Sequence, residues 1–202
     1  MIEFFIDTST SLSTIALLKD KKLINQKHIY SNNDLSNNLF KYIVELFDEV
    51  SIKPTQISRI YAATGPGSFT GIRIGLTVAK IYAYALNINI VPISSLQILA
   101  SSVKDDMIIS LIDARRGYVF AGGYDDSLNT FFKDTYINLN ELKEKYPNAK
   151  YVSIDNFDFE VIKPNIDIEK VIALNNSCEI NAHDIKPNYL KITEAEANLK
   201  NA

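Results

Sequence analysis

Two aspartates occupy equivalent places in the chain and carry its clearest potential for chemistry. Asp7 ends an apolar run and is followed by Thr8 and Ser9, and Asp113 ends a second apolar run and is followed by Ala-Arg-Arg. Carboxylates at such places can orient a metal-bound nucleotide. An aspartate at a turn can also simply accept hydrogen bonds from its own backbone. Because a phosphate-binding turn would place glycine where these turns have larger residues, the sequence favours the second interpretation for both.

The most glycine-rich stretch is a turn that precedes a long apolar segment. Its members are Gly65, Pro66, Gly67, Ser68, Phe69 and Thr70. The N-terminus of the following helix would offer free N–H groups to an anion. The turn nevertheless lacks the Gly-Lys-Ser/Thr ending of a P-loop, and its glycine spacing differs from the dinucleotide fingerprint. A tight turn with Ser68 or Thr70 as the helix cap is therefore favoured.

No combination of side chains in the sequence predicts a catalytic or metal-binding set. The two histidines, His28 and His183, are far apart and lack metal-ligand spacing. Ser68 lies outside a Gly-x-Ser-x-Gly elbow, and the single cysteine, Cys178, has no nearby histidine. We therefore expect no catalytic residue and no metal ligand on this chain, and the lone cysteine fits a reducing compartment.

The apolar pattern around these turns predicts an α/β protein. Strands are expected over residues 2–7, 13–18, 23–30, 60–63, 87–91, 107–113, 118–124, 128–136 and 150–154. Helices are expected over residues 35–50, 71–86, 94–102, 138–146 and 168–174. The charged break at residues 104–106 divides the chain into an N-terminal lobe, 1–103, and a smaller C-terminal lobe, 104–202.

An internal echo links the two lobes. Each begins with an apolar strand that ends in aspartate, followed by a tight polar turn and a returning strand. Duplicated units of this kind are worth looking for before other features. An aspartate at the mouth of a strand hairpin, repeated in two lobes, is the layout of actin-like, Hsp70-like (ASKHA) folds. The expected architecture is therefore two-lobed, each lobe a mixed sheet with flanking helices.

Two helices of the first lobe carry more apolar surface than one core requires. Gly71, Gly75 and Ala79 recur every four residues and would let another helix approach closely. Phe40 and Val44 lie off the main apolar stripe of the preceding helix. A contiguous apolar patch marks a binding site. The predicted partner interface comprises Leu39, Phe40, Ile43, Val44, Phe47, Gly71, Gly75, Val78, Ala79 and Tyr82.

Composition limits the classes of partner. The chain has 202 residues and a formal net charge of -3, so it lacks the basic footprint of a protein that grips nucleic acid alone. Its N-terminus shows no basic segment followed by a long apolar run, as a signal peptide would. Arg73 and Lys80 interrupt the longest apolar helix and disfavour a membrane span. The expected compartment is the cytoplasm, with no membrane partner.

Several segments, in their order and spacing, carry a resemblance to a known family. They read IDTSTSLSTIALL, TGPGSFTGIRIGLTVAK, ISSLQILA, IDARRGYVFAGGY and KPNYLKITEAE. Together they resemble the TsaB (YeaZ) family over nearly the whole chain, and the glycine motif at residues 65–75 is highly specific to it. The usual late Tyr-Leu-Arg reads Tyr189-Leu190-Lys191 here, and many relatives have a histidine where this chain has residues 33–36.

The resemblance implies a two-lobed actin-like fold and a role in tRNA modification. By this resemblance the chain would be a non-catalytic scaffold and dimerisation subunit of the complex that forms N6-threonylcarbamoyladenosine in tRNA next to the anticodon. The implied partners are the catalytic subunit TsaD, which it activates, the ATPase TsaE, and a second copy when TsaD is absent. Contact with tRNA would occur only through the complex. No cofactor is implied on this chain, with ATP-dependent chemistry in the partners.

Two rival functions remain open on the residues alone. One is a small-molecule kinase of the actin fold, and the other is a glycoprotease-like metallohydrolase. The kinase would need intact glycine-rich phosphate loops, and the hydrolase would need paired histidines. The sequence has neither.

Overall fold

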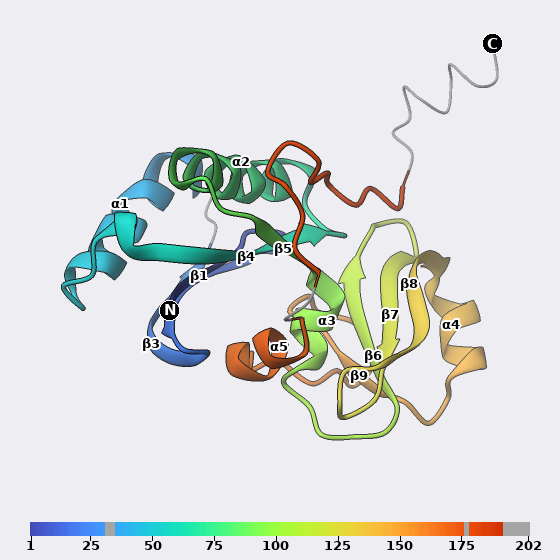
Figure 1. Cartoon of the computed structure of the whole chain (residues 1–202). Helices are drawn as coiled ribbons and strands as arrows, with labels where there is room; N and C mark the ends of the chain where they lie inside the picture. The colour runs from blue at the N-terminus through green and yellow to red at the C-terminus, as the bar shows by residue number, and fades with distance from the viewer. Residues whose placement is uncertain (31–34, 176–177, 192–202) are drawn as a thin grey trace, which may run out of the picture.

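The computed structural model describes residues 1–30, 35–175 and 178–191. Its sheets and helices alternate in layers (Figure 1). Helices α1 (Leu35–Asp48) and α2 (Phe69–Leu86) cover one face of the first sheet. Helices α3 (Ser95–Ala100) and α5 (Ile168–Leu174) lie between the two sheets, and α4 (Leu139–Lys145) covers the far face of the second. The α/β class predicted from the sequence is confirmed.

The first sheet has the strand order β3-β2-β1-β4-β5. Its strands are β1 (Ile2–Asp7), β2 (Leu12–Lys19), β3 (Lys22–Tyr30), β4 (Ile57–Gly65) and β5 (Ile90–Ser94). Strand β1 is antiparallel to β2 and parallel to β4. Side chains alternate between faces, so Phe4 and Ile6 pack under α1 and α2 while Phe5 packs toward α3 and α5. A strand buried on both faces reads as a continuous apolar run, which explains the N-terminal sequence.

The second sheet repeats the topology of the first. Its order, β8-β7-β6-β9, corresponds to β3-β2-β1-β4. The strands are β6 (Ile108–Asp113), β7 (Tyr118–Tyr124), β8 (Thr130–Asn138) and β9 (Lys150–Val152). Strand β6 is antiparallel to β7 and parallel to β9. The internal echo noted in the sequence is therefore a repeated arrangement of four strands.

One strand was placed wrongly by the sequence analysis. The strand expected over residues 87–91 is β5, which runs from Ile90 to Ser94 with Pro92 inside it. Asn87 is instead the left-handed cap of α2. Proline is tolerated because β5 lies at the end of the sheet order, where one side of the strand needs fewer hydrogen bonds. Helix α2 also begins at Phe69, two residues before the predicted start.

Helix α2 is the longest helix of the described residues, with 18 residues. Its apolar sequence raises the question of a membrane span. None of the helices in the described ranges combines the length and the apolar character that crossing a bilayer requires.

A single hydrophobic cluster joins the two halves of the chain. It includes Phe5 and Tyr61 from the first sheet, Leu96 from α3, and Ile108 and Tyr124 from the second sheet. The predicted lobe boundary at residues 103 and 104 falls between α3 and β6. Because the cluster extends across that point, each half completes its core against the other.

A buried polar network also joins the halves. The Ser94 hydroxyl donates to one carboxylate oxygen of Asp134 at 2.5 Å, and the Tyr124 hydroxyl donates to the other at 2.6 Å. Ser94 Oγ in turn accepts from the backbone N–H of Leu96, at the start of α3. Burial raises the pKa of Asp134 above its ordinary value of 3.8, although both hydroxyl hydrogen bonds oppose the shift.

This network predicts a specific pH dependence of stability. The raised pKa of Asp134 contributes stability that is present at low pH and is lost as pH rises from 3.8 through the raised pKa. The Asp134→Asn variant does not titrate at this position and keeps one acceptor and one donor for the two hydroxyls. Its free energy of unfolding, relative to the wild type, should therefore increase as the pH rises from 3.8 through the raised pKa of Asp134.

Urea unfolding at a series of pH values measures this difference. The control is Asp158→Asn, at an exposed site, for which the difference should stay constant. A constant difference for Asp134→Asn as well would contradict the assignment.

Candidate functional site

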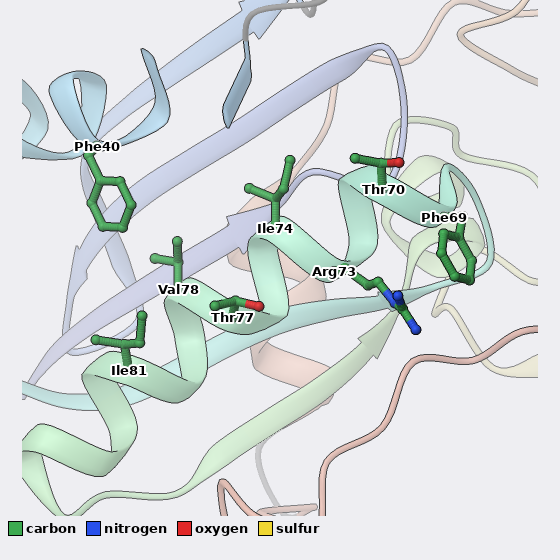
Figure 2. Close-up of a pocket in the computed structure, with 8 residues that line it drawn as sticks. All are labelled: Phe40, Phe69, Thr70, Arg73, Ile74, Thr77, Val78 and Ile81. Carbon is green, nitrogen blue, oxygen red and sulfur yellow. The ribbon is translucent and has the colours of Figure 1, made fainter. Parts of the chain in front are cut away.

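A mainly apolar groove lies over α1 and α2. It has a volume of about 470 Å³. Figure 2 shows its lining residues, with Phe40 on α1 and the others on α2. The lining residues are Phe40, Phe69, Thr70, Arg73, Ile74, Thr77, Val78 and Ile81. The groove is thus mainly apolar, with two hydroxyls and one positive charge.

Helix α2 can lie close to the sheet because its inner face carries glycine. A Cβ at Gly71 would lie 2.0 Å from the Thr8 carbonyl oxygen, and a Cβ at Gly75 would lie 2.3 Å from Thr8 Oγ1. The Thr8 hydroxyl donates to the Gly71 carbonyl at 2.7 Å. The stripe of small residues is therefore occupied by the turn between β1 and β2 of the same chain.

The turn that leads into α2 is fixed by the same neighbour. Gly67 has φ +153°, and a Cβ there would lie 2.2 Å from the Ser9 carbonyl oxygen. That carbonyl accepts from the Ser68 N–H at 2.7 Å. Ser68 is the helix cap, with its hydroxyl accepting from the Gly71 N–H at 3.2 Å. The motif is thus a tight turn that docks α2 on the first hairpin.

The outer face of α2 repeats with the same period as its inner face. Phe69, Arg73, Thr77 and Ile81 follow one another at four-residue intervals and are all exposed. This stripe lies two residues out of phase with the glycine stripe, so it points to the opposite side of the helix. Its large side chains keep exposed surface, although Tyr189 contacts Phe69 and Arg73.

The predicted interface residues divide into a buried and an exposed group. Phe40 and Val44 are exposed to 52% and 58% of their full area. Tyr82 is half-buried against Phe4, with ring centroids 5.8 Å apart. The others are buried in the chain's own core: Leu39, Ile43, Phe47, Gly71, Gly75, Val78 and Ala79.

The buried group corrects the expectation that glycine and alanine on α2 receive a partner helix. They pack instead on the sheet and on Thr8, and α1 turns its regular apolar stripe to the same core. Only Val78 of this group also reaches the floor of the groove. Direct contact with a partner is left to the side chains on the outer surface.

Sequence reasoning did not include Arg73, Ile74, Thr77 or Ile81 in the interface. The signal that could have found them is the second four-residue stripe, which the glycine stripe obscured. It also gave no role to Tyr189, which stacks on Phe69 with centroids 4.9 Å apart and accepts from Arg73 Nε at 2.9 Å. Arg73 and Tyr189 are separated by 116 positions in the sequence, so no local pattern indicated that contact.

The groups around Asp7 are already engaged within the chain. Asp7 Oδ1 accepts from the Ser9 N–H at 2.9 Å and from the Ser9 hydroxyl at 2.6 Å. Asp7, Thr8 and Ser9 are all buried, and burial raises the pKa of Asp7 despite the hydrogen bonds from Ser9. The geometry is that of a turn capped by its own aspartate, with its polar groups satisfied internally.

Asp113 plays the corresponding part in the second half. Its Oδ1 accepts from the Arg115 N–H at 2.8 Å, and its own N–H donates to Asp155 Oδ2 at 2.7 Å. Unlike Asp7 it is exposed. Arg115 and Arg116 adopt positive φ in this turn, where a phosphate-binding turn would need glycine.

The described residues also contain no group of three or more His, Cys, Asp or Glu side chains placed to hold a metal ion. The groove over α1 and α2 therefore remains the candidate site. Its shape and apolar character suit a protein partner.

Comparisons with known proteins agree with this architecture. The family model described as "TsaD: tRNA N6-adenosine threonylcarbamoyltransferase" matches residues 29–184. The chain is 31% identical to the tRNA threonylcarbamoyladenosine biosynthesis protein TsaB of Bacillus subtilis, covering 95% of each chain. It is 30% identical to the Haemophilus influenzae protein of the same name, over 57% of this chain and 50% of the relative.

Solved structures show the same fold. The structure described as YeaZ from Pseudomonas aeruginosa matches with a TM-score of 0.75 and 21% identity, over 94% of this chain and 99% of that one. A second Pseudomonas aeruginosa structure, of an uncharacterised protein similar to peptidase YeaZ, matches with a TM-score of 0.78 and 20% identity over the same shares.

The repeated strand order and the layered helices define a two-lobed α/β protein of the actin-like (ASKHA) class. Within that class, sequence identity over nearly the full length settles the family. The chain belongs to the TsaB (YeaZ) family, within the broader group that the TsaD family model describes.

The close contact between α2 and Thr8 leads to a prediction about stability. In Gly75→Ala, the new Cβ would meet Thr8 Oγ1, and moving Thr8 would break its hydrogen bond to Gly71. We expect a loss of about 1–3 kcal/mol in the free energy of unfolding, although alanine favours helix by about 1 kcal/mol. Urea unfolding measures the change, with Thr77→Ala on the exposed face as the control.

Adding Thr8→Ala should recover part of the loss, because it removes the atom that the new Cβ meets. A double-mutant cycle gives the coupling between the two positions. Purely additive effects would show that the contact does not limit the packing.

Proposed function

We propose that this chain is a non-catalytic subunit of the machinery that forms N6-threonylcarbamoyladenosine in tRNA. The single observation that carries the proposal is the exposed apolar groove over α1 and α2, in a chain whose family is named for this pathway. Phe40, a large apolar side chain, is exposed to 52% of its full area. An exposed apolar patch of this kind marks a surface that another protein covers.

The engaged turn at Asp7 supports an accessory role. A phosphate-binding turn needs free N–H groups and space beside them. Here the Ser9 N–H and hydroxyl are both bound to Asp7, and the Thr8 hydroxyl is bound to Gly71. We therefore propose that this chain carries no cofactor and that ATP-dependent steps belong to its partners. The rival kinase would have to open this turn before it could bind a nucleotide.

The partners follow from the same proposal. TsaD covers the groove in the working complex, TsaE joins that complex, and a second copy covers the groove when TsaD is absent. Contact with tRNA is made through the complex, in line with the net charge of -3. The cytoplasm is the compartment in which we expect the chain to act, because its pathway modifies tRNA.

The first test measures the modification itself. Removing the gene should abolish threonylcarbamoyladenosine in tRNA digests, and restoring the wild-type chain should return it. Asp7→Asn should restore the modification as well, because asparagine retains the acceptor oxygen for Ser9 and no chemistry depends on the carboxylate. Mass spectrometry of nucleosides gives the readout.

Asp113→Asn serves as the matched variant at the second turn. If folded Asp7→Asn protein failed to restore the modification while Asp113→Asn succeeded, Asp7 would have a chemical role and the non-catalytic proposal would fail. Unchanged modification after removal of the gene would overturn the function altogether.

The second test concerns the docking surface. In the double variant Phe40→Glu and Val44→Glu, both charges lie on exposed positions, so the fold should persist. Binding to TsaD and self-association should each weaken by at least about 2 kcal/mol, as expected for central interface residues. Light scattering and titration calorimetry measure the two assemblies.

Circular dichroism verifies that the variant is folded. The control is Leu174→Glu, an exposed apolar residue on α5 away from the groove. Normal binding to TsaD by the folded double variant would show that the docking surface lies elsewhere.

A further inference from the structure

We propose that Arg73 is a prearranged cation that receives a carboxylate from the partner helix in the α1–α2 groove. The inference rests on the proposed function, because it assumes that this groove binds a partner. It adds a chemical requirement that the apolar surface alone does not impose. The partner must present an acidic side chain beside its apolar stripe.

Arg73 is held by two neighbours, Phe69 on its own helix and Tyr189 in the C-terminal segment. Its Nε donates to the Tyr189 hydroxyl at 2.9 Å, and its guanidinium carbon lies 4.2 Å from the centroid of the Phe69 ring. Phe69 and Tyr189 are themselves stacked at 4.9 Å with an angle of 24° between their planes. These contacts engage Nε and the side of the guanidinium that lies over the Phe69 ring, so the two terminal nitrogens are the donors that a carboxylate would meet.

The C-terminal segment that supplies Tyr189 is itself tied to the first sheet. Asn188 donates its N–H to the Thr64 carbonyl at 2.7 Å, directly before the glycine turn. Upstream, Ile185 is buried in the core, and Ile180 exchanges two backbone hydrogen bonds with Ile90 on β5. Tyr189 therefore reaches Arg73 from a fixed backbone.

The ordered position of the Arg73 side chain favours binding of a carboxylate. A long side chain that is already ordered loses less conformational entropy when it forms an ion pair. The planar guanidinium also matches a carboxylate through two parallel N–H donors, and it can stack on an aromatic ring at the same time. The arrangement at Arg73 meets both conditions.

The position of Arg73 connects it to the groove. It lines the hollow at the N-terminal end of α2, and Ile74, Val78 and Ile81 continue the hollow along the helix toward Phe40 (Figure 2). Among the lining residues it is the charged one, and none is acidic. No ion pair between Arg73 and a carboxylate occurs among the described residues.

Charge favours a different protein over a second copy as the occupant. Helix α2 has no acidic residue, and its charged residues are Arg73 and Lys80. On α1 and just beyond it, Glu45 and Glu49 both pair with Lys27. Among the α1 carboxylates that a second copy could offer to Arg73, Asp48 is the one for which the structure shows no ion pair.

The test compares charge variants of Arg73 in binding to the TsaD subunit of the same organism. Arg73→Glu should weaken the affinity at least tenfold, and Arg73→Lys should weaken it less because the charge remains. Tyr189→Phe keeps the ring stack but removes the hydroxyl, so it should give a smaller loss without changing thermal stability. Lys133→Glu, an exposed charge reversal on β8, should have no effect.

Salt dependence and charge reversal on the partner identify the carboxylate. Wild-type binding should weaken as salt is added, and Arg73→Glu should remove that part of the dependence. In the Arg73→Glu background, one Asp→Lys or Glu→Lys change on a TsaD helix should restore binding. Absence of any rescue across the acidic residues of TsaD would overturn the inference.

The outcomes separate this inference from the proposed function. Normal binding by Arg73→Glu, with loss by the Phe40 and Val44 double variant, would overturn the role of Arg73 and leave the docking surface standing. Normal binding by both would overturn the docking surface itself. If Arg73→Glu and Asp48→Lys each abolished self-association while TsaD binding stayed intact, a second copy would be the occupant and the present choice of partner would be wrong.

Discussion

The structure depends on the close approach of α2 to the turn between β1 and β2. The backbone of α2 and of the turn before it approaches closely there, since Gly67 and Gly71 face the carbonyls of Ser9 and Thr8 and Gly75 faces the Thr8 side chain. The Ser68 N–H and the Thr8 hydroxyl bond across the contact. A chain with 7 glycines uses three of them at this one place. The contact sets how α2 lies on the sheet and therefore which of its residues face outward.

The same contact shapes both the turn at Asp7 and the outer face of α2. In the first turn the Thr8 hydroxyl donates to α2, and the Ser9 N–H and hydroxyl donate to Asp7. These three donors are therefore not free to bind a phosphate. With its glycine stripe held inward, α2 must turn Phe69, Arg73 and Ile81 outward. The engaged polar groups of the turn and the exposed outer face of α2 are two consequences of one packing arrangement.

The sequence predicted those features that depend on local pattern. Burial on both faces gives β1 and β6 the continuous apolar runs from which they were predicted. The pattern could not show which surface fills the glycine stripe, because Thr8 lies 63 residues before Gly71. A helix with a glycine stripe has the same sequence pattern whether a partner or another segment of its own chain packs against it. The hydrogen bond between Arg73 and Tyr189 and the hydrogen bond between Ser94 and Asp134 were missed for the same reason, since each joins distant segments.

The two halves repeat one topology and share one hydrophobic cluster. Their shared core includes α3 and α5, and the carboxylate of Asp134 accepts from hydroxyls of both halves. Relative motion of the halves would expose that core and take the Ser94 hydroxyl away from the partly buried Asp134 carboxylate, at a cost of about 1–3 kcal/mol for the lost hydrogen bond. An actin-like enzyme that closes on a nucleotide must allow such motion. A subunit that presents a groove to a partner needs the opposite property, because a groove fixed before binding loses less entropy on docking.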